Sequence, residues 1–232
     1  MIRLRRSEER GYADHGWLKA RHSFSFSSYH DPAHMHFRHL RVINEDRIAP
    51  GGGFPMHSHQ DMEIITYIIN GALEHQDSMG NGEVLRPGEI QRMSAGSGIT
   101  HSEFNPSDSN PTHLLQIWIL TDSKGIAPSY EQRSYRERSV PNALCLLARK
   151  GGSDGVVHVN QDMSLYTALL EAGHDIAYPV DTGRNQWVQL VRGSIEINGE
   201  GLSAGDGAAI TGETQLTIRG RESAEFLLFD LS

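Results

Sequence analysis

The sequence has one cysteine in 232 residues, Cys145, and it lies within the apolar run 143–148. A single cysteine excludes an internal disulfide and any zinc site that is built from several cysteines. A reactive thiol needs an exposed, electropositive setting, which this run does not offer. We therefore interpret Cys145 as an inert, buried side chain.

Long apolar runs are absent as well. Stretches such as 64–69 fall far short of the roughly 20 residues that a membrane-spanning helix requires. The basic start at residues 1–6 is followed by charged residues at 7–10, where a signal peptide would have its apolar core. We expect no contact with a membrane and a cytoplasmic location. The 38% of hydrophobic and 22% of charged residues are typical of a globular protein.

Positive charge is in the minority, because 21 lysines and arginines face 29 aspartates and glutamates, for a net charge of −8. Such a field repels phosphate backbones, so we expect no direct nucleic-acid partner. Histidine is scarce only in the second half: eleven of the thirteen lie at or before His113. Histidine is the commonest metal ligand and a frequent acid or base, so we expect the chemistry in the first half.

Helical patterns are missing, and short segments rich in β-branched and aromatic residues take their place. Bounded by Gly, Pro, Asn or Asp, these segments predict strands at 40–43, 63–69, 88–93, 114–120, 165–170, 187–191, 194–197 and 225–229. Asn198-Gly199 predicts a hairpin turn. At most one helical turn is expected, near residues 129–136. Many short strands at even spacing predict an all-β sandwich or barrel.

A faint internal repeat relates the two halves. Residues 69–74 lead on to 85–90, and residues 191–196 lead on to 202–207. Both copies run apolar-x-Gly, strand, turn and then Leu-x-x-Gly-acid, which predicts two β lobes made by duplication. The polar, proline-containing stretch 122–142 is the expected boundary. We therefore expect an N-terminal domain at 1–135 and a C-terminal domain at 136–232.

Two pairs of potential ligands stand out in the first half: His57-x-His59 and His101-x-Glu103. On a strand, residues i and i+2 share a face about 6.6 Å apart, so two paired strands can bring all four groups around one ion. Three imidazoles and one carboxylate suit Fe, Mn, Co, Ni, Cu or Zn, and leave positions open for catalysis. Glycines flank both pairs, whereas the His34-x-His36 pair lacks that context and is expected to be structural.

The surroundings of these ligands resemble the two motifs of the cupin superfamily, Gly51-x5-His57-x-His59-x3-Glu63 and Gly98-x2-His101-x3-Asn105. More narrowly, the segments 10–18, 22–26, 57–67, 74–81 and 93–103 resemble bacterial proteins of the pirin family. The resemblance implies a bicupin, with two β-barrels of the jelly-roll type face to face and a metal only in the N-terminal barrel. It implies His57, His59, His101 and Glu103 as ligands. Glu63 matches a glutamate that ligates in many other cupins, and we interpret it as a supporting residue or alternative ligand.

Pirin-like proteins resemble quercetin 2,3-dioxygenases, which implies an oxidoreductase that turns quercetin and O₂ into a depside and CO. In that reading one divalent transition metal is the cofactor, with iron as the first expectation and Cu, Mn, Co, Ni or Zn as alternatives. Glu103 would be the catalytic group that accepts the proton of the flavonol 3-hydroxyl. His75, Gln116 and Trp118 are expected to line the pocket.

Two other functions compete with this one. The first is a metal-binding regulatory protein that interacts with a protein partner, as eukaryotic pirin is thought to do, and the acidic surface suits such a partner. The second is a cupin-type isomerase of sugars or keto acids. That reaction needs a cation for a phosphate near the metal; the first half offers Arg41, Arg86 and Arg92 but no phosphate-binding motif. Two lobes packed together are expected to form a monomer.

Overall fold

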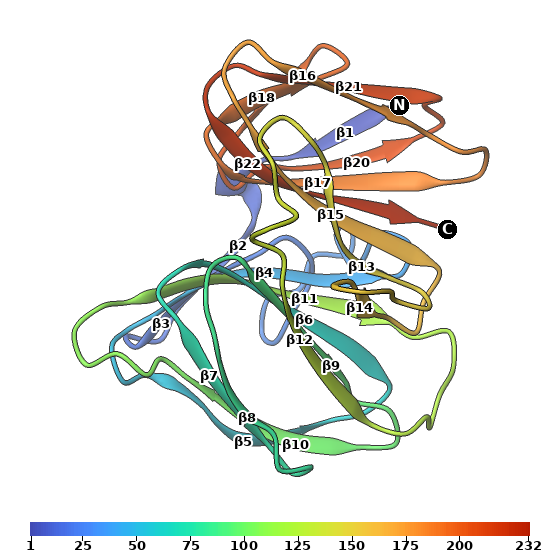
Figure 1. The fold of residues 1–232 in the computed structure, drawn as a ribbon. Helices are drawn as coiled ribbons and strands as arrows, with labels where there is room; N and C mark the ends of the chain where they lie inside the picture. The colour runs from blue at the N-terminus through green and yellow to red at the C-terminus, as the bar shows by residue number, and fades with distance from the viewer.

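Strands make up nearly all the regular structure of the computed structural model, which describes residues 1–232. The one helical element is a 3₁₀ turn, η1 (Ser7–Glu9). Figure 1 shows the strands gathered into two lobes, one stacked on the other. No helix of the structure is long and apolar enough to cross a membrane.

The first lobe, which we call the N-lobe, consists of two sheets that face each other. Its seven-stranded sheet has the order β12-β9-β6-β11-β4-β3-β2, and its four-stranded sheet has the order β5-β10-β7-β8. The larger sheet comprises β2 (Gly11–Asp14), β3 (Leu18–His22), β4 (Leu40–Ile48), β6 (Met62–Asn70), β9 (Glu89–Ser94), β11 (Thr112–Leu120) and β12 (Ser129–Ser134). The smaller comprises β5 (Gly53–His59), β7 (Leu73–Asp77), β8 (Gly82–Leu85) and β10 (Ile99–Phe104).

The C-lobe repeats this plan, with sheet orders β1-β20-β17-β22-β15-β13-β14 and β16-β21-β18-β19. The larger sheet comprises β1 (Ile2–Arg5), β13 (Cys145–Arg149), β14 (Val157–His158), β15 (Met163–Leu170), β17 (Asn185–Arg192), β20 (Gly207–Thr211) and β22 (Ala224–Leu231). The smaller comprises β16 (Asp175–Pro179), β18 (Ser194–Ile197), β19 (Glu200–Ser203) and β21 (Gln215–Gly220). Because β1 pairs with β20, the expected first domain of residues 1–135 gives its first strand to the other lobe.

The sequence repeat has a structural counterpart in two glycines. Gly71 joins β6 to β7 at φ 81°, and Gly193 joins β17 to β18 at φ 75°. A Cβ atom at Gly193 would lie 2.1 Å from the carbonyl oxygen of Ser223, and one at Gly71 would lie 2.8 Å from that of Pro111. Both positions therefore require glycine for backbone conformation and for space. The same turn closes the same corner of each lobe.

The two seven-stranded sheets pack against each other across the lobe boundary. Their facing side chains form one cluster of 24 buried residues, which includes Ile43 and Ile117 from the N-lobe and Leu165 and Phe229 from the C-lobe. Period-two alternation explains this, since each strand of the larger N-lobe sheet turns one face to the C-lobe and the other into its own barrel. The centre of the sheet is consequently apolar on the C-lobe side, and the barrel side is free to carry polar chemistry.

All eight expected strands are present, and the all-β prediction is confirmed. Asn198 (φ 47°) and Gly199 (φ 93°) form the predicted turn between β18 and β19. The helical turn expected near residues 129–136 is wrong: residues 129–134 form β12, an edge strand paired with β9. Its polar composition gave no apolar alternation to detect, because an edge strand is held mainly by backbone hydrogen bonds and its side chains stay half-exposed.

Candidate metal centre

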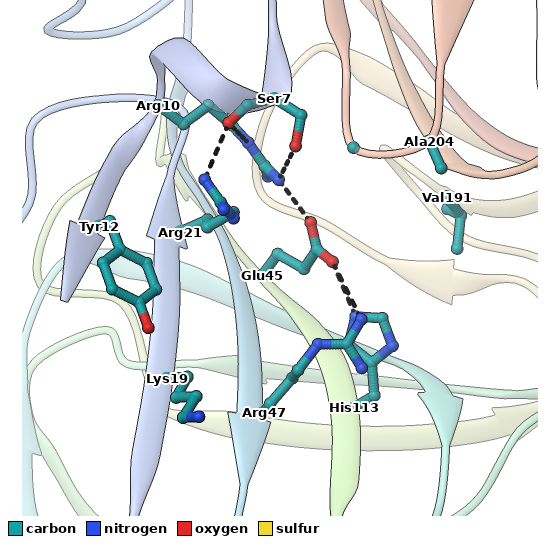
Figure 2. A pocket seen from close by; sticks show the side chains of 11 residues that line it. Ser7, Arg10, Tyr12, Lys19, Arg21, Glu45, Arg47, His113, Val191 and Ala204 are labelled. Atoms are coloured by element: carbon teal, nitrogen blue, oxygen red, sulfur yellow. Dashed lines mark hydrogen bonds and ion pairs between the residues drawn. The ribbon is translucent and has the colours of Figure 1, made fainter. Parts of the chain in front are cut away.

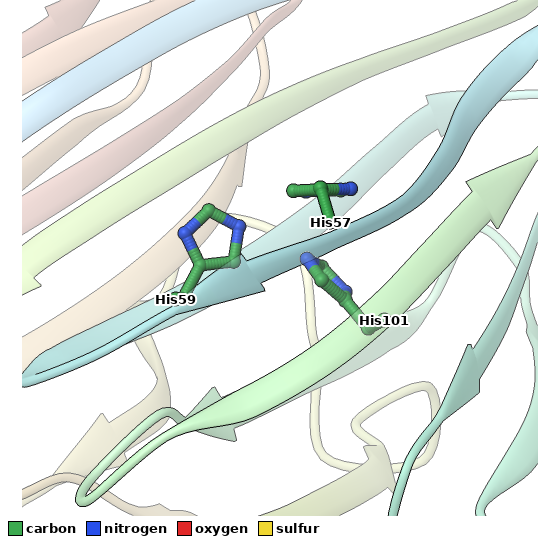
Figure 3. A group of neighbouring side chains, drawn as sticks. All are labelled: His57, His59 and His101. Atoms are coloured by element: carbon green, nitrogen blue, oxygen red, sulfur yellow. The ribbon is translucent and has the colours of Figure 1, made fainter.

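Three imidazole rings converge inside the N-lobe, as Figure 3 shows. His57 and His59 extend from β5, and His101 lies directly opposite His57 on the paired strand β10. One potential ligand atom from each ring falls within 4.8 Å of the other two. Two histidines at i and i+2 on one strand and a third on the paired strand thus place three potential metal-ligand nitrogens around one point.

Hydrogen bonding fixes which nitrogen of His57 is free. Its Nδ1 lies 2.8 Å from the carbonyl oxygen of Pro55. A carbonyl oxygen can only accept, so Nδ1 carries a proton and Nε2 is the nitrogen available to a metal.

Hydrogen bonds that run from Asp77 through His75 to His101 determine which nitrogen of His101 is available to a metal. Burial pushes the pKa of Asp77 upward, but hydrogen bonds from Asn81, His75 and backbone amides outweigh it and hold that pKa below its usual value. The carboxylate therefore accepts from His75 Nε2, at 3.2 Å. His75 Nδ1 is then an acceptor for His101 Nδ1, 3.4 Å away. This leaves His101 Nε2 unprotonated, and that atom is buried without any hydrogen-bond partner.

Two of the three converging histidines, His59 and His101, have pKa values well below the ordinary one. Burial, together with the neighbouring His57, His59 and His75, lowers the pKa of His101 to about 2. Burial and the proximity of His57 lower the pKa of His59 to about 4. Neutral imidazole is the form that binds metal, so the site needs little proton release before binding. The orphaned nitrogen and the donor set fit a divalent transition metal.

Glu103 follows His101 on β10, but a β-bulge separates the two. His101 is opposite His57, whereas Glu103 is opposite Phe54. The Glu103 carboxyl therefore belongs to a second group, with His75 and His101, whose ligand atoms lie within 4.8 Å of one another. Burial raises the pKa of Glu103 to about 7, although the hydrogen bond from Gln116 opposes that rise. A carboxyl with this pKa can give or take a proton near neutral pH.

A cavity of about 280 Å³ opens beside the three histidines. Phe26, Phe54 and Trp118 form its apolar walls, and Trp118 meets His59 edge to face with ring centroids 4.9 Å apart. Apolar walls around a few polar groups are typical of a small-molecule site.

The polar side of this cavity is a row of residues in cross-strand register. His22 on β3 is opposite Asn44 on β4, and Asn44 is opposite Gln116 on β11. His22 Nδ1 and Asn44 Oδ1 are 2.7 Å apart. Because neighbouring strands present the same face at these positions, residues distant in sequence form one continuous polar strip beneath Glu103.

Asp46 also lines the cavity, two residues beyond Asn44 on the same face of β4. Its side chain is buried, and Oδ1 has no hydrogen-bond partner. Burial, with smaller contributions from Glu103 and Glu45, raises the pKa of Asp46 to about 8. It is therefore a neutral acid at pH 7, able to donate and to accept. Asp46 was not among the residues expected from the sequence, since an acid near the end of a strand carries no distinctive signal.

The other expected site residues take different positions. Gln116 and Trp118 line the cavity, whereas His75 is outside its lining and stacks on Tyr130 with ring centroids 4.9 Å apart. Glu63 is in neither ligand group. Its Oε1 accepts from the hydroxyl of Ser94 at 2.6 Å and from the amide of Asn160 in the C-lobe at 3.1 Å, so Glu63 lies where the lobes meet.

Two β lobes, each with a seven-stranded and a four-stranded sheet, together with a histidine cluster inside one of them, define a protein of two cupin-type domains. The family model described as Pirin matches residues 3–119, and the model described as the quercetinase C-terminal cupin domain matches residues 146–231. The chain belongs to the pirin family.

Several relatives match over their full length. The chain is 47% identical over 231 residues to the quercetin 2,3-dioxygenase of Escherichia coli K12, covering 100% of this chain and 99% of that protein. It is 42% identical over 231 residues to a pirin-like protein of Caulobacter vibrioides, covering 99% of each. The crystal structure of the bacterial pirin YhhW of E. coli in complex with nickel(II) superposes with a TM-score of 0.95 at 46% identity, covering 100% of this chain and 99% of that one.

Proposed function

We propose that this protein is a metal-dependent dioxygenase that acts on flavonols and converts quercetin and O₂ into a depside and CO. The observation that carries the proposal is the buried carboxyl of Glu103. It lies beside His101 of the three-histidine cluster and lines the same aromatic-walled cavity as His57 and His59. The name of the E. coli relative, quercetin 2,3-dioxygenase, agrees with this chemistry.

His57, His59 and His101 would hold the metal, with Glu103 as the fourth ligand. The C-lobe has no His-x-His pair, which favours a metal in the N-lobe alone. Iron stays our expectation for the native ion; nickel(II) in the related bacterial pirin agrees with a site that takes several first-row metals. When bound, such an ion lowers the pKa of a hydroxyl group that coordinates it.

The residues of the chain would then bind, orient and deprotonate the substrate. Phe26, Phe54 and Trp118 offer flat apolar surfaces against which an aromatic ring system can pack. Glu103 would accept the proton of the flavonol hydroxyl. Gln116, which donates to both of its oxygens at 3.1 Å, would hold the carboxylate in place while it does so.

Asp46 would supply a polar anchor away from the histidines. As a neutral carboxyl without a partner at Oδ1, it can accept a hydrogen bond from one ring hydroxyl and donate another. A polyhydroxylated aromatic substrate satisfies this buried group, whereas an unsubstituted ring leaves it unpaired at a cost of about 1–3 kcal/mol.

The test is turnover of quercetin by protein reconstituted separately with Fe, Mn, Co, Ni and Cu, followed by loss of flavonol absorbance and by CO release. We expect a Glu103→Gln variant to lose about 10²–10⁴-fold in kcat/KM, the usual contribution of a general base. Glu83→Gln, which changes an exposed glutamate on β8, is the matched control and should keep full activity. Absence of turnover with all five metals would reject the proposal.

A further inference from the structure

A second cavity, of about 410 Å³, lies between the lobes and shares no lining residue with the metal pocket. Figure 2 shows it from close by. Successive side chains of β3 and β4 point to opposite faces of the sheet, so each strand contributes to both cavities. Ala20 and Asp46 face the barrel, whereas Arg21 and Arg47 face this cleft. The two cavities therefore lie on opposite faces of one sheet.

The charge in the cleft is unbalanced. Four cationic side chains line it, and the lining contains one carboxylate, Glu45. Both oxygens of that carboxylate are already hydrogen-bonded. Oε2 accepts from Arg10 Nη2 at 2.6 Å, and Oε1 accepts from His113 Nε2 at 2.9 Å. The cleft is strongly positive in a chain whose net charge is −8.

Two of the four cations form no ion pair, and the ion pair of Arg47 is long. Arg47 lies 3.9 Å from Glu45, Arg21 donates to the carbonyl oxygen of Ser7 at 3.2 Å, and Lys19 forms no ion pair. The register places Lys19 opposite Arg47, and like charges in cross-strand pairs repel each other. An anion between them would relieve that repulsion.

The nearby acidic groups outside the lining have other partners. Asp206 is bonded to Arg6 and to the backbone amide of Ser7, at 2.8 Å each. Asp14, opposite Lys19 on β2, accepts from the backbone amide of Gly16 at 2.9 Å. Asp14 interacts electrostatically with Lys19 and Asp206 with Arg10, but neither carboxylate lines the cleft.

The fourth cation, Arg10, lines the cleft as a buried side chain. Its side chain is fully buried, and its Nη1 makes no hydrogen bond. Burial lowers the pKa of Arg10 in spite of the adjacent Glu45, so a buried guanidinium is incompletely compensated here. Such a group is stabilised by further negative charge nearby.

We propose that this cleft is a binding site for a phosphate group, carried either by inorganic phosphate or by a small phosphomonoester. Arginine forks match phosphate oxygens in geometry, and lysine adds a compact charge. A phosphomonoester carries about −1.5 to −2 charges at neutral pH, and inorganic phosphate also carries more than one. Both suit Lys19, Arg21 and Arg47 better than the single charge of a carboxylate does. The cavity volume lies within the range of small-molecule sites.

The test is isothermal titration calorimetry of the full-length, metal-loaded protein with inorganic phosphate and with glycerol 3-phosphate, at an ionic strength kept constant with NaCl. We expect saturable binding of at least one of them. Arg47→Ala and Lys19→Ala should each weaken it about 10-fold or more, which corresponds to about 1.4 kcal/mol. Tighter binding of glycerol 3-phosphate would identify a phosphomonoester as the ligand, and equal or weaker binding would identify phosphate itself.

Two controls separate the cleft from other effects. Arg133→Ala removes a comparably exposed arginine from the edge strand β12 and should leave binding unchanged. His101→Ala removes a candidate metal ligand and should also leave it unchanged, because the cleft shares no residue with that site. No saturable heat with either probe, or equal affinity in the wild type and both cleft variants, would overturn the proposal.

Discussion

The side-chain amide of Gln116 donates to both carboxyl oxygens of Glu103, at 3.1 Å each, and these are the only hydrogen bonds that the carboxyl receives. Burial and this amide act in opposite directions on the pKa of Glu103 and leave it at about 7. In the metal-free protein, this balance between burial and Gln116 sets the pH at which the Glu103 carboxyl ionises.

Replacing Gln116 by Leu should shift the pH profile of quercetin turnover. Without the amide, the ionised form of Glu103 loses its stabilisation, so its pKa rises and the acid limb of kcat/KM moves to higher pH. Gln76→Leu, at an exposed position on β7, is the control. An acid limb that stays in place in the Gln116→Leu variant would contradict the assignment of Glu103 as the base.

Asp77→Asn should weaken metal binding without contact with the metal. Without the carboxylate, the tautomer of His75 is no longer fixed, and neither is that of His101, which depends on His75. Changes of this kind typically cost about 10–100-fold in metal affinity. Competition with a chromophoric chelator measures the affinity directly. The exposed Asp108→Asn serves as the control, and equal affinities in both variants would show that the chain of hydrogen bonds has no such effect.

Glu45→Gln should lower stability at neutral pH and much less in acid. Burial alone would raise the pKa of Glu45, but His113 and Arg10 outweigh it and lower the pKa to about 2 from an ordinary 4.5. The stability from this depressed pKa is present above pH 4.5 and is lost as pH falls toward 2. Its size is on the order of 2–3 kcal/mol. Urea unfolding at pH 7 and pH 3 measures it, and an equal deficit at both values would disprove the linkage.

Asp46→Asn should have the opposite pH dependence. The folded pKa of about 8 lies above the ordinary 3.8, so the stability linked to the bound proton is complete below pH 3.8 and is lost as pH rises through 8. The free energy of unfolding of the Asn variant, relative to that of the wild type, should therefore increase from pH 5 to pH 8. Urea unfolding of metal-free protein measures it. A difference that stays constant over this range would mean that Asp46 is ionised in the folded state.

Local sequence pattern was sufficient for the strands and for the expected histidine pairs. The strand at 63–69 carries enough apolar and β-branched residues to be recognised alone, and His57 and His59 share a face by period two. The family resemblance, rather than spacing, favoured Glu103 over Glu63 as a ligand. In the structure Glu63 is held by Ser94 and Asn160, a partner in the other lobe that no local pattern predicts.

Cross-strand register was the part that the sequence could not supply. Lys19, Arg47 and His113 are neighbours only because β3, β4 and β11 pair in one particular register, and the same holds for His22, Asn44 and Gln116. The pairing of β1 with the C-lobe likewise depends on a free edge at β20. Each of these features is set by tertiary packing, which a single sequence leaves undetermined.

The most direct test of the account is CO released per quercetin consumed, measured on anaerobically purified protein of known metal content, for the wild type and for His101→Ala. We predict one metal ion per chain and one CO per quercetin for the wild type. For His101→Ala we predict loss of both, with an unchanged circular dichroism spectrum. Metal retention and CO release by the His101→Ala variant, or a metal-loaded wild type that leaves quercetin intact, would contradict the central claim.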